Sequence, residues 1–314
     1  MHRRTLLLGI VGLGAAGCSV SDPRITGTPK PIYTPPAPVP PVGADHLAGL
    51  EAGVAALLTA MAGAPWAAGD TARYQLIASV HQTHHAVLAS AEPLRRQPVP
   101  VDPVTVGAPA TREQALTTAA GLLTTLQNAH TALAAQATGD LAAFWASQAA
   151  SAVQSRTALT TAVSTVTRAV PLRVVAVTTP ATATDDLLNR YHEAVFGLES
   201  ALGRLTTANP ARTALDGIVV EVKTQRDALT ARGRAASQTP APGAAAYSIP
   251  TTASDADALA LVARLLAAIS QGAAVAVASA TKDVTTAVGD LADASILGLP
   301  LGMGMAEYPG WPDS

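Results

Sequence analysis

Residues 45–61 read DHLAGLEAGVAALLTAM, and most of their large apolar side chains recur every three or four residues. That interval matches the turn of an α-helix, so these side chains share one face that can pack on a core. The residues on this face are Leu47, Leu50, Val54, Leu57, Leu58 and Met61. The stretch predicts a packed amphipathic helix, and the chain that follows it should supply the neighbours that cover this face.

The same helical pattern returns in seven later segments. Thr111 precedes Gln114 by three residues, as in a capping box, and Ser254 precedes a long apolar run. Apolar residues make up 49% of the chain but aromatic residues only 3%, so closely packed, alanine-faced helices should fill the core. The predicted helices cover about residues 70–88, 111–133, 140–167, 184–205, 210–232, 254–280 and 281–297.

A break near the middle of the chain divides these helices into two groups of four. Residues 172–177 read LRVVAV between Pro171 and Pro180, are rich in β-branched residues and carry no helix cap. We therefore expect an N-terminal helical bundle at 44–170, an extended connector at 171–181 and a C-terminal bundle at 182–314. The predicted fold is all-α, with two consecutive four-helix bundles. Whether the two halves are a duplication stays open, because no clear residue-level repeat relates them.

The N-terminus has the pattern of an export signal at residues 1–17. Arg3 and Arg4 form a positive start, and an apolar run extends from residue 6 to residue 16. That run is shorter than the about 20 residues that cross a bilayer. Residues 15–18, AAGC, resemble a bacterial lipobox, which implies acylation, for example with palmitate, of Cys18. Cys18 is the only cysteine, and lipidation would explain an odd thiol in an oxidising compartment.

Two export routes fit this signal equally well. Residues 3–7, RRTLL, resemble the twin-arginine signal, but two arginines also suit the general secretory route. Residues 18–43 are rich in proline and predict a disordered, semi-rigid spacer. The expected location is the outer face of the bacterial cytoplasmic membrane, with the membrane itself as partner through lipid at Cys18.

Composition and motifs argue against several functions. The net charge is −2 and no concentrated basic face is evident, so nucleic acid is not an expected partner. The chain has no Gly-x-Ser-x-Gly elbow and no phosphate-binding glycine loop, which disfavours an enzyme and leaves no cofactor to expect. Residues 259–280 are apolar enough to resemble a membrane span, but Arg264 and Gln271 interrupt them and favour a buried helix.

Four short stretches of the second half carry a family resemblance. They are LNRYHEAVFG at 188–197, QRDAL at 225–229, AYSIP at 246–250 and YPG at 308–310. Taken in this order, they resemble a ferritin-like domain of unknown function that occurs in actinobacterial exported lipoproteins. The resemblance covers residues 182–311, roughly two fifths of the chain. It implies a four-helix bundle for that half and no established activity.

The second half lacks the ligands of a di-iron centre. Such a centre takes a Glu from each of two helices and Glu-x-x-His from each of two others. No acidic residue of the chain has a histidine three residues later, and residues 254–297 contain no glutamate. We therefore expect no metal in the C-terminal bundle. His192, Glu193 and Glu199 form a candidate polar pocket there, although a paired or solvated edge is the simpler interpretation.

The first half contains a histidine cluster made of His81, His84 and His85. The spacing of His81 and His85 suits zinc, but zinc needs further ligands and groups that orient them. His130 or Glu51 could supply a ligand only if the bundle brings them close. Because two histidines alone are not a site, a surface or bundle-edge cluster is the simpler interpretation.

These observations favour a non-enzymatic structural or binding module of the cell envelope. One alternative is a metal-binding protein or metal-dependent oxidoreductase that uses the histidines of the first half. A second is a small-ligand or lipid carrier with a pocket between alanine-lined helices.

Overall fold

The structure is a computed structural model that describes residues 39–168, 175–250 and 252–311. The described residues are almost entirely helical, which confirms the all-α fold class. The predicted signal, Cys18 and the spacer up to residue 38 lie outside the described residues. The helices are α1 (Ala44–Ala62), α2 (Thr71–Leu88), α3 (Arg112–Gln136), α4 (Gly139–Ala158), α5 (Pro180–Arg204), α6 (Ala211–Ala235), α7 (Asp255–Ser279) and α8 (Val284–Ile296).

Local capping chemistry sets several of the helix starts. The hydroxyl of Thr111 accepts a hydrogen bond from the backbone N–H of Gln114, 3.2 Å away, at the start of α3. Ser254 and Asp257 form a reciprocal capping box at the start of α7. The predicted start of α5 at residue 184 was wrong: the helix begins at Pro180, capped by Thr179. Proline suits the first helical position because its missing N–H would have no partner there.

The predicted end of α4 was also wrong, because the helix ends at Ala158 and not near residue 167. The threonine-rich chain beyond it leaves the helix, and β1 (Val166–Thr167) pairs in parallel with β2 (Met305–Ala306). Backbone N–H groups of Met305 and Glu307 donate to the carbonyls of Thr165 and Thr167, each at 3.0 Å. The small two-stranded sheet ties the end of the first half to the end of the chain.

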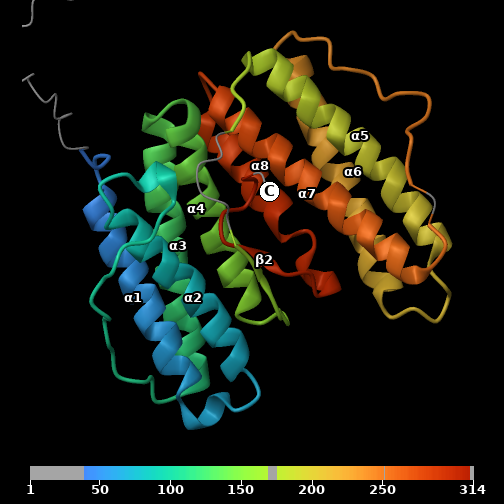
Figure 1. The fold of residues 1–314 in the computed structure, drawn as a ribbon. Coiled ribbons are helices and arrows are strands. Elements are labelled where there is room, and N and C mark those ends of the chain that lie inside the picture. The colour runs from blue at the N-terminus through green and yellow to red at the C-terminus, as the bar shows by residue number, and fades with distance from the viewer. Residues whose placement is uncertain (1–38, 169–174, 251, 312–314) are drawn as a thin grey trace, which may run out of the picture. The chain divides into compact units, whose positions relative to one another are not determined.

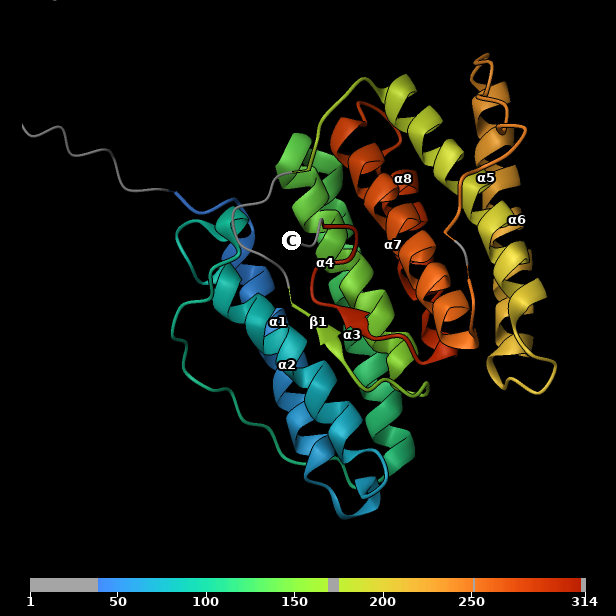
Figure 2. The same ribbon diagram turned by 45° about the vertical axis from the view of Figure 1, so that its right-hand side comes forward.

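The helices pack mainly as sequence neighbours (Figures 1 and 2). α1 lies on α2, α3 on α4, α5 on α6 and α7 on α8. α7 and α8 also pack against α4, so they lie between the first half and the α5–α6 pair. Long connections occur at residues 89–111 between α2 and α3, at residues 159–179 between α4 and α5, and at residues 236–254 between α6 and α7. The division into bundles at 171–181 stays a prediction, and residues 169–174 lie outside the described part.

α4 is the most completely enclosed helix, because α3, α7 and α8 all pack on it. Its large side chains, Phe144 and Trp145, are fully buried among small ones that let the other helices approach. α7 and the stretch 284–301 are long and apolar enough to cross a membrane by length and composition. In the structure α7 packs against α4, α5 and α8, as a core helix does.

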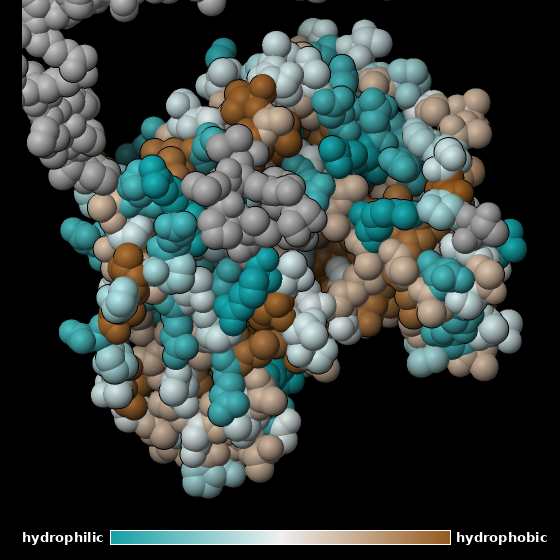
Figure 3. Space-filling view, in the orientation of Figure 1, coloured by the Kyte–Doolittle hydropathy of each residue, from teal (hydrophilic) through white to brown (hydrophobic). Residues whose placement is uncertain are grey.

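The last described residues, 299–311, return to the first half and are called the C-terminal segment here. They begin with the short 3₁₀ helix η3 (Leu299–Leu301) and include β2. Ser147 of α4 donates to the carbonyl oxygen of Pro309 at 2.8 Å, and Gln154 accepts from the N–H of Ala306 at 3.1 Å. Figure 3 shows this face of the molecule hollowed where the C-terminal segment faces α7. The segment thereby brings Glu307 and Tyr308 to the interior of the first half.

Candidate metal centre

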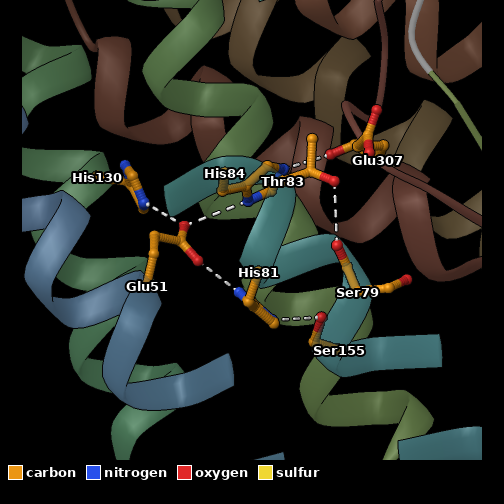
Figure 4. Close-up of polar contacts among 8 residues, drawn as sticks. All are labelled: Glu51, Ser79, His81, Thr83, His84, His130, Ser155 and Glu307. Carbon is orange, nitrogen blue, oxygen red and sulfur yellow. Dashed lines mark hydrogen bonds and ion pairs between the residues drawn. The ribbon is translucent and has the colours of Figure 1, made fainter. Parts of the chain in front are cut away.

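Four polar side chains meet in the interior of the first half (Figure 4). Glu51 comes from α1, His81 and His84 come from α2, and His130 comes from α3; none of the four is exposed to solvent. The carboxylate of Glu51 points between the three imidazole rings. The sequence showed only that Glu51 and His130 could join the histidines of α2 if the helices brought them close. In the structure the helices do so, and Glu51 contacts all three histidines.

Each of these residues occupies a core position of its own helix. Glu51 stands between Leu47 and Leu58 on the apolar face of α1, and all three are buried. On α2, residues 77, 81, 84 and 88 follow the helical period and are all buried. On α3, His130 follows Leu126 by four residues on the buried side. Helical packing of the apolar neighbours thus carries the four polar groups inward.

The glutamate carboxylate contacts all three histidines. Its Oε2 lies 2.5 Å from Nδ1 of His81, and its Oε1 lies 3.2 Å from Nδ1 of His84 and 3.1 Å from Nε2 of His130. An ionised carboxylate only accepts hydrogen bonds, so each of these ring nitrogens donates to it. Burial by itself would raise the pKa of Glu51, but the facing charges of His81 and His84 and the hydrogen bonds bring it well below its usual value.

The outer nitrogens of His81 and His84 have partners as well. Nε2 of His81 lies 2.9 Å from the hydroxyl of Ser155 on α4, and Nε2 of His84 lies 2.7 Å from the backbone carbonyl oxygen of Glu307. A carbonyl also only accepts, so without a metal His84 carries a proton on both nitrogens. Burial opposes that charge, but Glu51 outweighs it and raises the pKa of His84. The metal-free cluster therefore holds a Glu51–His84 ion pair.

His130 is in a different state from His84. Burial lowers its pKa, despite the hydrogen bond to Glu51. Its Nδ1 has no hydrogen-bond partner among the described residues, and its ring stacks on Trp145 with centroids 5.8 Å apart. The ring of Tyr308 lies 4.8 Å from that of His84. Aromatic walls on two sides lower the local dielectric and strengthen the charge interactions within the cluster.

The donor set fits a divalent transition metal. One possible ligand atom from each of Glu51, His81 and His84 lies within 4.8 Å of the other two. Imidazole nitrogens with one carboxylate suit zinc, iron, copper or nickel. Donor atoms of a tetrahedral zinc site are roughly 3.3 Å apart, given metal–ligand distances of about 2.0–2.1 Å. The His84 and His130 contacts to Glu51 are already near that separation, and the His81 contact would have to lengthen.

One residue of the predicted histidine cluster, His85, lies apart from these four side chains. His85 is half-buried on another side of α2, where it lines a pocket with Asp102 of the α2–α3 connection. The inward pair of α2 is therefore His81 and His84, three residues apart, and not His81 and His85. A signal for the site was present in the sequence: a charged or imidazole side chain at a core position on three helices.

The three residues of the candidate polar pocket in the second half, His192, Glu193 and Glu199, have different surroundings. His192 packs against the 236–254 connection, where burial and nearby Arg226 lower its pKa. Glu199 is exposed and pairs with Lys223 at 2.6 Å. Glu193 is half-buried. The role predicted for these three residues stays a prediction.

No protein-family model matches this chain, and no curated protein or solved structure is detectably similar to it. The resemblance of residues 182–311 to a ferritin-like domain therefore stays a prediction, and the site has to be interpreted from its own geometry.

Proposed function

We propose that this protein is a metal-binding module of the bacterial envelope, which holds one divalent transition metal ion at Glu51, His81, His84 and His130. A bound ion would take the place of the protons that the cluster carries without metal. The protein's part is to bind and orient the ion in a site closed to bulk water. No catalytic role is assigned to the module.

This proposal rests mainly on the hydrogen bonds that the two histidines of α2 make through Nε2, the ring nitrogen that faces away from Glu51. Histidines that ligate metals almost always donate their other N–H to a carbonyl, a carboxylate or a similar group, which fixes the ring and its tautomer. His84 has the Glu307 carbonyl in that place, and His81 has the Ser155 hydroxyl. Both rings consequently present Nδ1 to the same carboxylate, as two ligands of one ion would.

The cost of the cluster without a metal also supports the proposal. Burying a charged glutamate and three imidazoles costs several kcal/mol unless each group is fully paired, and an apolar core of equal volume is often at least as stable. Without a metal, this cost is offset only by the hydrogen bonds and the ion pair that Glu51 makes with the three histidines. A divalent ion bound between these groups would offset it further, through its charge and its bonds to the ring nitrogens that face Glu51.

The order of the donors along the chain supports a ferritin-like arrangement of α1–α4. Ferritin-like bundles have one long crossover between their second and third helices, and this half has its long connection at residues 89–111. Di-iron bundles take single ligands from two helices and i, i+3 pairs from the other two. Here α1 and α3 give single ligands, Glu51 and His130, and α2 gives the i, i+3 pair. With one carboxylate in place of four, the set suits one ion better than two.

The proposed location follows from the N-terminal sequence. The export signal at 1–17, lipidation at Cys18 and the spacer at 18–43 would hold the helical body at the outer face of the cytoplasmic membrane. A metal module there would meet ions outside the cell. Palmitate labelling that depends on Cys18, together with membrane fractionation, tests this part separately.

Metal content and titration test the site. Protein purified without a tag should contain close to one equivalent of zinc, iron, copper or nickel, or take up one equivalent of Zn²⁺ after treatment with a chelator. His84→Ala and Glu51→Ala should each abolish stoichiometric binding. His85→Ala is the matched control, since it changes the next residue of α2 and leaves the cluster intact. If the His84→Ala protein bound Zn²⁺ as tightly as the His85→Ala protein, the site would be misassigned.

A further inference from the structure

Two buried side chains of α4 have polar atoms with no hydrogen-bond partner among the described residues. They are Gln148, whose Oε1 and Nε2 both lack one, and Ser151, whose Oγ lacks one; neither residue is exposed. Buried polar groups are nearly always paired, so a group of unpaired ones points to water, an ion or a ligand between them. Because the two residues are one turn apart, they share a face of the helix.

The direction of that face follows from helix geometry. Ser155 of α4 faces His81, and Trp145 stacks on His130. A helix turns about 100° per residue, so Gln148, seven residues before Ser155, points within about 20° of the same direction. Ser151 lies about 40° from it by the same geometry. Both residues stand between the level of Trp145 and the level of Ser155, and they therefore face the glutamate–histidine cluster.

Polar groups that point elsewhere from α4 do have protein partners. Ser147 donates to the carbonyl of Pro309 at 2.8 Å. Gln154 donates to the carbonyl of Ser295 at 2.6 Å and accepts from Ala306 at 3.1 Å. The unpaired atoms are thus confined to the face that meets the cluster. The hydroxyl of Tyr308, whose ring contacts both His84 and Phe144 of α4, also lacks a partner among the described residues.

We infer that the metal centre keeps one coordination position for an exchangeable small ligand, water or a monovalent anion, and that Gln148 and Ser151 hold that ligand. The inference rests on the proposed function. A divalent ion with one carboxylate and neutral imidazoles keeps a net positive charge, which favours an anion. The amide N–H of Gln148 and the hydroxyl of Ser151 can both donate to that anion, and such charge-assisted hydrogen bonds are strong. Full burial of all the surrounding groups restricts the ligand to a few atoms.

Azide binding to the Co²⁺-loaded full chain tests the inference. Co²⁺ reports its ligands through visible absorption, and azide is a small monovalent anion. Azide should change the spectrum saturably. Gln148→Met and Ser151→Ala should weaken azide binding by at least about tenfold, as expected for a hydrogen bond to a charged group, with one Co²⁺ still bound. Thr157→Ala is the control, because it removes a hydroxyl of the same helix that donates to the carbonyl oxygen of Val153, 3.0 Å away and also in α4.

The outcomes separate this inference from the proposed metal site. If Co²⁺ binds but azide leaves its spectrum unchanged, the exchangeable position is absent and the metal site stands. Equal weakening by Thr157→Ala and Ser151→Ala would assign the effect to the packing of α4 and overturn the inference. If the wild-type chain takes up no Co²⁺, both proposals fail. Should Gln148→Met prevent folding, the comparison of Ser151→Ala with Thr157→Ala still decides the question.

Discussion

Nε2 of His84 lies 2.7 Å from the backbone carbonyl oxygen of Glu307, 223 residues later in the chain. This hydrogen bond joins the candidate metal centre to the C-terminal segment, which is held in turn by α4 and by β1. The orientation of a residue on the second helix therefore depends on the end of the chain. Changes near residue 310 should consequently reach the metal centre.

Gly310→Ala should destabilise the fold and weaken metal binding. Gly310 has φ +77°, and an added Cβ would lie 2.6 Å from the carbonyl oxygen of Ser270. Strain of this kind costs about 1–3 kcal/mol, and displacing a group that orients a ligand typically costs about 10–100-fold in metal affinity. Thermal unfolding and Zn²⁺ titration measure the two effects. Gly302→Ala is the control, since φ there is +72° but the added Cβ meets nothing within 4 Å.

Glu51→Gln should strongly destabilise the metal-free protein. It leaves His84 without its counter-charge in a site closed to water, and breaking a buried ion pair in this way costs about 3–5 kcal/mol. Urea unfolding at pH 7 in the presence of a chelator measures the loss. Glu199→Gln removes a carboxylate from the exposed pair with Lys223 and should cost less than about 1 kcal/mol. Similar losses from both variants would contradict the charge state derived for the cluster.

Acid should unfold the metal-free protein through Glu51. Its pKa is lowered in the folded state, so its contribution is present above the pKa of the unfolded chain and is lost as the pH falls through the folded value. Urea unfolding between pH 3 and pH 6 should show stability that declines with pH, and Glu51→Gln should flatten that decline. An unchanged slope in the variant would show that other carboxylates control acid unfolding.

Around neutral pH two histidines should act in opposite directions. The pKa of His84 is raised in the folded protein, so its protonation stabilises the fold fully below the pKa of histidine in the unfolded chain, about 6.5. That stabilisation is lost as the pH rises through the pKa of His84 in the folded protein. The lowered pKa of His130 has the reverse effect, because below about pH 6.5 the unfolded chain binds a proton that the folded chain does not. His130→Phe should therefore make stability fall more steeply from pH 6 to pH 8. Urea unfolding across that range measures the slope.

The alanines of α4 should tolerate little enlargement. Ala149 is fully buried, and overfilling a close-packed core costs typically about 1–3 kcal/mol. Ala149→Leu should lower the free energy of unfolding by about that amount, measured by urea titration. Ala135→Leu on the exposed face of α3 serves as the control and should leave stability nearly unchanged. Equal effects would argue against close packing around α4.

Much of the helical structure could be predicted from the sequence because helix signals are local. The cap at Thr111, the capping box at Ser254 and the apolar face of residues 45–61 each depend on residues within a few turns. The start of α5 and the end of α4 were predicted wrongly because local signals alone do not decide them. Thr184 and Asp185 are acceptable caps in isolation, and β1 exists only because β2, far along the chain, pairs with it.

The candidate site likewise has features that the local sequence shows and features that depend on contacts between distant parts of the chain. Sequence alone determined that three histidines lie together on one helix and that the second half lacks the ligands of a di-iron centre. Only the tertiary structure decided that His84 and not His85 points inward, and that Glu51, His130 and the Glu307 carbonyl meet there. The reason is physical: a helix period depends on neighbours a few residues away, but the contacts between α1, α2, α3 and the C-terminal segment depend on how distant apolar faces pack together.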